Sequence, residues 1–249
     1  MQCNRNFVFI FLTGFLLISC ETTGNALEKD PFPSSMSSSE GKRADPDAAN
    51  WDIDRLDTAR DVTYLSEVEK DVILEMNKAR DNPKKYAELY IQPRLKNYSG
   101  RNYSVPGKIT RITQEGAAAV NNCISSMSRM QSVGLLVPEL GMSLAAKDHV
   151  QDQGRTRNTG HTGSDRSDPF KRMERYGTWL TTAGENISYG ESTGRDIVVA
   201  LLIDDGVSSR GHRTNIMSKD FSKTGVSVGS HQQYESMCVI NYAQDYRNK

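Results

Sequence analysis

The spacing of apolar positions separates an N-terminal region without periodicity from a longer region that has it. Between about residues 21 and 61, Ser, Thr, Gly, Asp, Asn and Pro dominate, and the stretch lacks the burial that would compensate its ordering entropy. Trp51 and Ile53 are apolar exceptions there. They either dock on a folded domain or, as is usual for isolated aromatic residues in linkers, have no identifiable role. We therefore expect a flexible tether over 20–62 and a folded domain over 63–249.

Helical spacing dominates the first part of this domain. Ser66 is followed three residues later by Glu69, the spacing of a capping box in which each side chain bonds the backbone N–H of the other residue. We interpret Asn77 and Arg80 in this helix as solvated or as donors to loop carbonyls. The signals predict helices from Ser66 to Asn82-Pro83, over 114–130, over 144–154 with Ser143 as N-cap, over 170–176 after Asp168-Pro169, and over 195–205 after Thr193 or Gly194.

Strand-like patterns appear late in the chain. The segments 225–229 and 237–246 alternate or run apolar, and the polar stretch between them makes a loop, so they predict a hairpin of antiparallel strands. Residues 185–190 add a further extended segment. Because helices come first and strands late, the order favours an α+β sandwich over a parallel sheet built from βαβ units.

Three short motifs in succession carry side chains capable of chemistry. His161 and His212 each follow a glycine, and Glu185 lies between them in sequence. An imidazole pair with a nearby carboxylate can hold a divalent metal or exchange protons, because both tasks need groups that titrate near neutral pH. Any one motif alone is also typical of an ordinary polar loop, and the succession favours a site. The motifs are GHTGSDRSDPF at 160–170, GEN at 184–186 and GHRTNIM at 211–217.

Two further polar residues need separate interpretation. Asp204 shares a predicted helix face with Ile197 and Leu201, and a carboxylate placed there is either partnered or functional, because an unpaired buried charge is costly. His149 lies inside a predicted helix beside Leu144 and other helix residues. We interpret it as a packed or surface residue and leave it out of the site.

The first twenty residues indicate export. Arg5 precedes one apolar run over 7–12 and a second over 15–18, which together have the length of a signal-peptide core. The sequence Leu17-Ile18-Ser19-Cys20 resembles the bacterial lipoprotein cleavage box, which implies a signal peptide over 1–19 and acyl chains on Cys20. An uncleaved short anchor is the alternative, and it gives the same extracytoplasmic location, in the periplasm or at the cell surface.

The balance of charged residues narrows the classes of binding partner. Lys plus Arg equals Asp plus Glu at 31 each, so the overall charge indicates neither a nucleic acid partner nor an anionic membrane surface. Membrane contact is therefore expected through the lipid anchor. Besides Cys3 and Cys20, only Cys123 and Cys238 remain, and in an exported protein they form either one disulfide or two buried thiols.

In this order the motifs resemble the CAP superfamily of cysteine-rich secretory proteins, antigen 5 and pathogenesis-related 1 proteins, in particular its bacterial SCP-like branch. NKARDNPKKYAELY, which begins at Asn77, is similar to the first helix of that branch, and the likeness covers about residues 64–245. The resemblance implies a three-layer α-β-α sandwich with a central antiparallel sheet and an open cleft with two histidines and two acidic residues. His161, Glu185 and His212 match three of these four positions.

The fourth position has two candidates. Many eukaryotic members have a glutamate there within a Trp-Tyr-Ser-Glu run, whereas this chain has Leu201-Leu202-Ile203-Asp204. Asp204 aligns best and is one methylene shorter than glutamate, and Asp205 is the alternative. The aromatic residues of that run are missing, so the resemblance is weakest for a shared peptide or lipid groove.

Three classes of function fit these residues. The first, which the resemblance favours, is a membrane-anchored binding module whose cleft takes a lipid, a small molecule or a partner protein, with zinc or another divalent metal on His161 and His212 as an option. The second is a metal-dependent hydrolase of peptides, esters or cell-envelope material, with Glu185 as general base toward metal-bound water. The third is a structural or adhesive role in which the cluster only stabilises the cleft.

Overall fold

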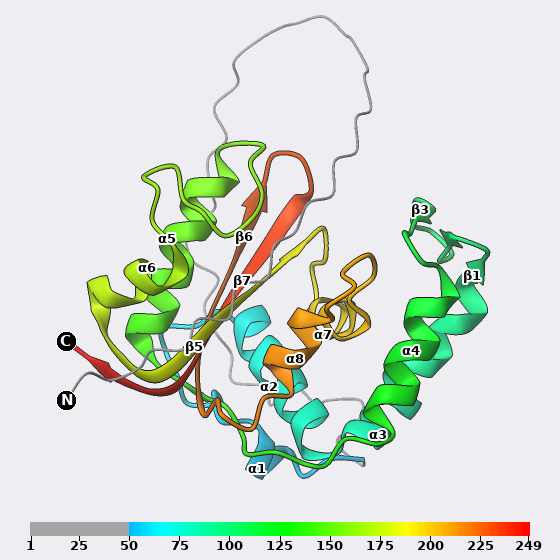
Figure 1. The fold of residues 1–249 in the computed structure, drawn as a ribbon, viewed down its shortest axis with the longest axis horizontal. Helices are drawn as coiled ribbons and strands as arrows, with labels where there is room; N and C mark the ends of the chain where they lie inside the picture. Colours follow the sequence, from blue (N-terminus) through cyan, green and yellow to red (C-terminus); the bar gives the residue numbers. More distant parts are fainter. Residues whose placement is uncertain (1–49) are drawn as a thin grey trace, which may run out of the picture.

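A computed structural model describes residues 50–249 of the chain (Figure 1). The predicted signal peptide, the lipidation site Cys20 and most of the predicted tether lie outside the described residues. No helix of the described part is both long and apolar enough to cross a membrane. In chain order the elements are α1 Ile53–Leu56, α2 Glu67–Asp81, α3 Pro83–Tyr86, the π-helical η1 Ala87–Ile91, the 3-10 helical η2 Gln92–Asn97, β1 Tyr98–Ser99, β2 Asn102–Tyr103, β3 Arg111–Ile112, α4 Ala117–Met127, β4 Val137–Pro138, α5 Leu140–Gly154, α6 Pro169–Tyr176, β5 Gly177–Tyr189, α7 Gly194–Ile203, α8 Gly211–Ile216, β6 Lys223–His231 and β7 Glu235–Asn248.

The main sheet has the order β4-β6-β7-β5. The long strands β5, β6 and β7 pair antiparallel, with Glu185 opposite Asn241 and Gly225 opposite Asn241 on the other side. The short β4 adds a two-residue parallel pairing to β6. The predicted hairpin is therefore confirmed, and β5 is longer than predicted because it begins at Gly177, directly after α6.

Alternate residues of β7 divide the core into two layers of helices. Successive strand residues point to opposite faces, and those of β7 join different apolar clusters. Figure 1 shows α5 and α6 on one side of the sheet and α2, α7 and α8 on the other. The α+β class and the three-layer α-β-α arrangement are thus confirmed. The residues facing α2, α4 and α7 are Cys238, Ile240 and Tyr242, and those facing α5 and α6 are Met237, Val239 and Ala243.

Local start signals predicted some helices correctly and one incorrectly. The Glu69 Oε2 atom accepts from the backbone N and the Oγ of Ser66 at 2.7 and 2.8 Å, so the capping box at the start of α2 is formed. The expectation that Ser143 caps α5 is wrong. The helix begins at Leu140, because the backbone N of Glu139 still bonds Thr224 O at 2.8 Å in the β4–β6 pairing and the chain turns into helix directly afterwards.

Asn77 and Arg80 are buried polar residues that hold loops on the core. Asn77 accepts from the backbone N of Leu136 at 2.8 Å and donates to Leu56 O at 3.0 Å. Of the two interpretations of these side chains, bonding to loop carbonyls is what the structure shows, since neither is solvated. The Arg80 guanidinium donates over 2.6–2.9 Å to four carbonyl oxygens, those of Gly134, Ile216, Ser218 and Phe221.

The folded part begins upstream of residue 63. Trp51 is buried, its Nε1 donates to Tyr90 OH at 2.8 Å, and its ring packs against those of Tyr86 and Tyr90. Leu56 is likewise buried. The predicted end of the tether at residue 62 is therefore too late, because the partners of Trp51 come from α3 and η1 and are not visible in the local sequence.

Cys123 and Cys238 are both free thiols in the apolar cluster beneath α2, α4 and α7. Of the two alternatives, buried thiols are what the structure has. The Cys123 Sγ donates to Leu202 O at 3.1 Å, and burial raises the pKa of Cys123 to about 12. Burial also raises the pKa of Cys238, so the thiolate, which is the nucleophilic form, is disfavoured at both positions.

Candidate functional site

The GEN motif lies near the middle of the edge strand β5, where successive side chains point to opposite faces of the sheet. Glu185 points toward α6 and the loop that carries His161, and the next residue, Asn186, points toward α8. The predicted site residues form two histidine–carboxylate pairs, one on each side of this strand.

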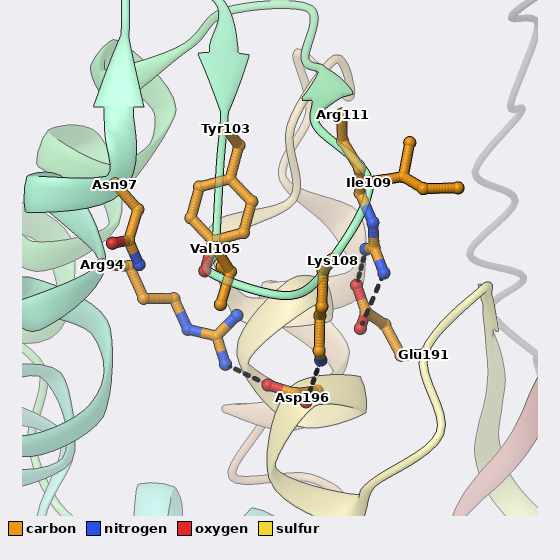
Figure 2. A pocket seen from close by; sticks show the side chains of 9 residues that line it. All are labelled: Arg94, Asn97, Tyr103, Val105, Lys108, Ile109, Arg111, Glu191 and Asp196. Atoms are coloured by element: carbon orange, nitrogen blue, oxygen red, sulfur yellow. Dashed lines mark hydrogen bonds and ion pairs between the residues drawn. The ribbon is translucent and has the colours of Figure 1, made fainter.

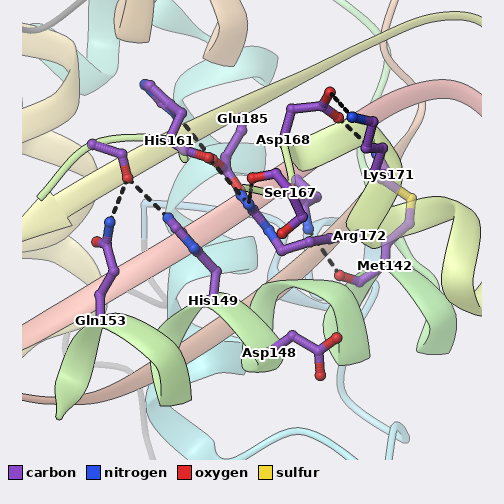
Figure 3. Close-up of polar contacts among 12 residues, drawn as sticks. Met142, Asp148, His149, Gln153, His161, Ser167, Asp168, Lys171, Arg172 and Glu185 are labelled. Carbon is purple, nitrogen blue, oxygen red and sulfur yellow. Dashed lines mark hydrogen bonds and ion pairs between the residues drawn. The ribbon is translucent and has the colours of Figure 1, made fainter. Parts of the chain in front are cut away.

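The first pair is braced by an arginine (Figure 3). The Nδ1 of His161 lies 2.8 Å from Glu185 Oε1, and Arg172 on α6 donates to Glu185 Oε2, also at 2.8 Å. A second guanidinium nitrogen, Nη1, donates to the backbone oxygens of His161 and Ser167 at 3.1 and 3.0 Å. The side chains of Glu185 and Arg172 are 1% and 2% exposed, whereas that of His161 is 23% exposed, so the imidazole is the part that solvent reaches.

The charge of Glu185 is set by this neighbour. Burial by itself would raise the pKa of Glu185, but the Arg172 guanidinium and the hydrogen bond with His161 outweigh it and hold the pKa below its ordinary value. Glu185 is therefore a carboxylate at neutral pH with both oxygens engaged. Arg172 was not identified from the sequence, because one arginine in a charged helix looks like a solvated residue.

The second pair is held together by a backbone turn at the end of α7. The Nδ1 of His212 lies 2.6 Å from Asp204 Oδ1, and the backbone N of His212 donates to Asp204 Oδ2 at 2.9 Å. Asp204 is the C-cap of α7, in the left-handed region with φ of 58°. It therefore does not continue the helix face of Leu201 as predicted, and the left-handed turn brings its carboxylate to the start of α8. The His212 side chain is 8% exposed.

Of the two candidates for the fourth position, the structure brings Asp204 to an imidazole. The Asp205 carboxylate turns the other way and accepts from the backbone N of Gln114 and of Glu115, at 2.6 and 2.8 Å. These two residues precede α4, so Asp205 joins that segment to the end of α7.

Two asparagines connect the pairs. Asn186 Nδ2 donates to His212 O at 3.0 Å and to Tyr242 OH at 3.1 Å, while Asn215 Nδ2 donates to Asn186 Oδ1 at 2.9 Å. Both residues stand inside the GEN and GHRTNIM motifs, and sequence reasoning gave them no role. The motif context was the available signal, because each follows a site residue by one or three positions.

His149 supports the first pair indirectly. It is fully buried, and its Nε2 contacts Gly160 O at 2.9 Å, an oxygen that also accepts from Gln153 Nε2 at 2.7 Å (Figure 3). The backbone N of Gly160 donates to Tyr189 OH at 2.9 Å. Burial lowers the pKa of His149, so this imidazole stays neutral at neutral pH. It is a packed helix residue, and it holds the residue that precedes His161.

Both pairs present the same chemistry. In each, the carboxylate contacts Nδ1, which fixes the ring and leaves Nε2 as the nitrogen directed away from the carboxylate. This is the arrangement that orients an imidazole toward a metal or a polar ligand. Within residues 50–249 there is no group of three or more His, Cys, Asp or Glu placed to hold a metal ion.

Two cavities are lined by residues outside these pairs. One, of about 210 Å³, lies between the β2–β3 connection and α7, where Arg94 and Lys108 pair with Asp196, and Arg111 pairs with Glu191 (Figure 2). Each of its three cations thus has a carboxylate partner, with Arg94 and Lys108 sharing Asp196. The other, of about 580 Å³, follows the outer edge of β6.

Comparisons with known proteins agree with this architecture. The model of the cysteine-rich secretory protein family, CAP, matches residues 75–242, which is more than half of the chain and includes both pairs. The uncharacterized protein YkwD of Bacillus subtilis (strain 168) is 33% identical over 85 residues, 34% of this chain and 31% of that protein. The matched region thus spans about a third of that curated relative.

Two solved structures are more distantly similar. An outer surface protein from Borrelia burgdorferi is 19% identical with a TM-score of 0.39, covering 47% of this chain and 80% of that chain. An extracellular protein containing a SCP domain from Bacillus anthracis str. Ames is 21% identical with a TM-score of 0.36, covering 51% of this chain and 38% of that chain.

Proposed function

The chain belongs to the cysteine-rich secretory protein family, and on that premise we propose that it is an exported binding module that engages its ligand through the imidazoles of His161 and His212. The observation that carries the proposal is the repeated contact between Nδ1 and a buried carboxylate. Two imidazoles fixed in this way are organised before a ligand arrives, so binding does not have to order them.

The hydrolase alternative is less well supported by the same contacts. A general base needs a carboxylate oxygen free to take a proton from water. In Glu185 one oxygen contacts His161 and the other Arg172, and the lowered pKa makes this carboxylate a weak base. A catalytic zinc ion also ordinarily has three protein ligands, and the two imidazoles supply two.

Zinc titration tests the proposal, because zinc reports whether both Nε2 atoms are accessible and act together. In calorimetry on the full-length protein in detergent, His161→Ala and His212→Ala should each remove most zinc binding. Protons compete for the same nitrogens, so affinity should fall with falling pH. His231→Gln is the control, since its Nε2 contacts Asn158 O and its Nδ1 accepts from backbone N–H groups.

The outcomes separate the classes of function. Equal zinc binding by all variants, or none by the wild type, would contradict a shared role for the two imidazoles and leave the pairs as a scaffold. Turnover of a fluorescent casein peptide or a nitrophenyl ester by the zinc-loaded protein, abolished by His161→Ala, would establish the hydrolase instead.

We also propose that the module is held on the outer side of a membrane through acyl chains on Cys20. The sequence Leu17-Ile18-Ser19-Cys20 supports this proposal. Cys20→Ala should shift the protein from the detergent phase to the aqueous phase in a phase-partition assay, because the acyl chains need that thiol. Cys3→Ala, within the predicted signal peptide, is the matched control and should stay in the detergent phase. A Cys20→Ala protein that partitions like wild type would show that the anchor lies elsewhere.

A further inference from the structure

The outer edge of β6 is covered by another described strand only at its start. β4 pairs Val137 and Pro138 with Lys223 and Thr224. In the described part of the chain no strand pairs with that edge from Gly225 to His231. An uncovered edge is a template for pairing with a further strand.

The hydrogen-bonding groups on this edge follow from two contacts. Thr224 O accepts from Glu139 N, and Val228 N donates to Glu69 Oε1 at 2.9 Å, so both residues direct their backbone groups outward. In an antiparallel pair the direction alternates residue by residue. Val226 and Ser230 therefore also face outward, whereas Gly225, Ser227 and Gly229 face β7.

A groove already exists along this edge. The cavity of about 580 Å³ lies between the segment that carries Tyr64 and Leu65 and the helix α5, with β6 at its base. α5 packs closely on β6 at Gly225, because a Cβ added there would lie 2.2 Å from the backbone C of Met142. This close packing holds the wall formed by α5 in place. Figure 1 shows α5 alongside β6. A ligand in the groove would meet a preformed space.

Glu69 marks the position that a partner's carbonyl would take. Its Oε1 accepts the outward N–H of Val228 as the carbonyl oxygen of a neighbouring strand would, while its Oε2 caps α2. The side chain thus satisfies one group of the edge. Val226 is 1% exposed, so the accessible part of the edge runs from Val228 to Ser230.

The two walls differ in charge. Lys147 on α5 and Arg155, the C-cap of α5, line one wall; both are exposed, and neither side chain has an ion-pair partner among residues 50–249. The opposite wall has Tyr64, which is 40% exposed, Leu65, which is 6% exposed, and Glu69. At about 1.5 Å per helical residue the two cations are roughly 12 Å apart along α5. An extended chain covers that distance in about four residues, so carboxylates at positions i and i+4 would face them.

We propose that this groove binds an extended acidic peptide segment of a partner protein, which pairs with β6 as an added strand. Alternate side chains of the segment point to the two walls, with carboxylates toward Lys147 and Arg155 and apolar groups toward Tyr64 and Leu65. The site is independent of the two histidines, so it would persist in the His161→Ala and His212→Ala variants.

The probe is the peptide acetyl-Glu-Val-Thr-Val-Glu-amide, titrated into the full-length protein in detergent, with amide hydrogen exchange read by NMR. Exchange should slow at the outward amide of Ser230, which is exposed. It should stay unchanged at Gly225, Ser227 and Gly229, whose N–H groups already bond β7. The peptide with lysines in place of its glutamates is the charge control and should not bind at the same concentrations.

A protein variant tests the charge. Lys147→Glu should weaken peptide binding about fivefold, from one exposed ion pair lost and one repulsion gained. Lys219→Glu, an exposed lysine outside the groove, should leave binding unchanged. Equal affinity in both variants, or protection without selectivity for the outward amides, would overturn the proposal. Protection of Ser230 in the protein alone would also overturn it. Protection at all protein concentrations would indicate cover by its own chain, and protection only at high concentration would indicate a second copy.

Discussion

The pairs His161–Glu185 and His212–Asp204 share one contact but are assembled differently. Asp204 and His212 are eight positions apart, and a left-handed turn after α7 joins them directly. His161 and Glu185 are 24 positions apart, on a loop and on β5. Arg172 on α6 contacts both of them. One pair is therefore local, and the other depends on tertiary packing.

This difference decides what can disturb each pair. In the local pair the carboxylate also holds the backbone N of His212, so the turn and the imidazole are fixed together. In the long-range pair the carboxylate is a buried charge whose partner is another buried charge. Such a pair contributes little net stability over apolar groups, but removing one member is costly because the other stays buried and unpaired.

The largest expected effect is therefore at Arg172. Arg172→Met should destabilise the fold by about 3–5 kcal/mol, because the Glu185 charge loses its buried partner. Urea unfolding at pH 7 measures the change. The His161 imidazole should become mobile in NMR spectra, while that of His212 keeps its chemical shift.

Arg175→Met is the matched control on the same helix. Arg175 pairs with Asp148 and Asp165 at 2.8 and 2.5 Å, but its side chain is 40% exposed. Exposed pairs contribute below about 1 kcal/mol, so this variant should be close to wild type. A cost for Arg172→Met no greater than that for Arg175→Met would show that the guanidinium does not brace the first pair.

The same contrast explains what the sequence could predict. The start of α2 and the β6–β7 hairpin depend on residues close in sequence, and both were predicted. Trp51, Ser143 and Arg172 have their meaning in contacts with distant segments, and each was misjudged or missed. Ser143 has a suitable side chain for an N-cap, but the β4–β6 pairing starts the helix four residues earlier.

At the site, the motifs identified His161, Glu185 and His212, and the structure places each in a pair with a carboxylate or imidazole. The sequence left Asp204 and Asp205 open, because both follow the same helix and differ only in the backbone turn between them. What decided between them was the positive φ of Asp204, which helix periodicity does not reveal.

A smaller effect is expected in the local pair, where asparagine can keep part of the geometry. Asp204→Asn should cost about 1.5 kcal/mol, because hydrogen bonds to a charged acceptor are weakened while asparagine tolerates the left-handed conformation. Asp204→Ala should lower the free energy of unfolding by about 1 kcal/mol more, because alanine is strained in the left-handed conformation. Urea unfolding gives the costs, and the His212 ring nitrogen shifts show whether the pair is lost.

Asp205→Asn separates the two aspartates. It should lower stability through the start of α4 but leave the His212 ring shifts and zinc affinity as in wild type, since its carboxylate bonds Gln114 and Glu115. Ring shifts that move in Asp205→Asn and not in Asp204→Asn would assign the fourth site position to Asp205.

The smallest expected effect is the pH dependence of the first pair, because burial of Glu185 opposes the influence of Arg172 on its pKa. The folded-state pKa lies below the ordinary value of 4.5, so the unfolded chain takes up the proton first as the pH falls. The stability that the ionised carboxylate contributes is thus fully present above about pH 4.5 and is lost below it.

Glu185→Gln cannot lose this contribution. The difference in free energy of unfolding between wild type and Glu185→Gln should be constant near neutral pH and should narrow from about pH 4.5 downward in urea titrations between pH 7 and pH 3. A difference that stays constant over this range would mean that the Glu185 pKa is the same in the folded and unfolded chain, and that Arg172 does no more than offset burial.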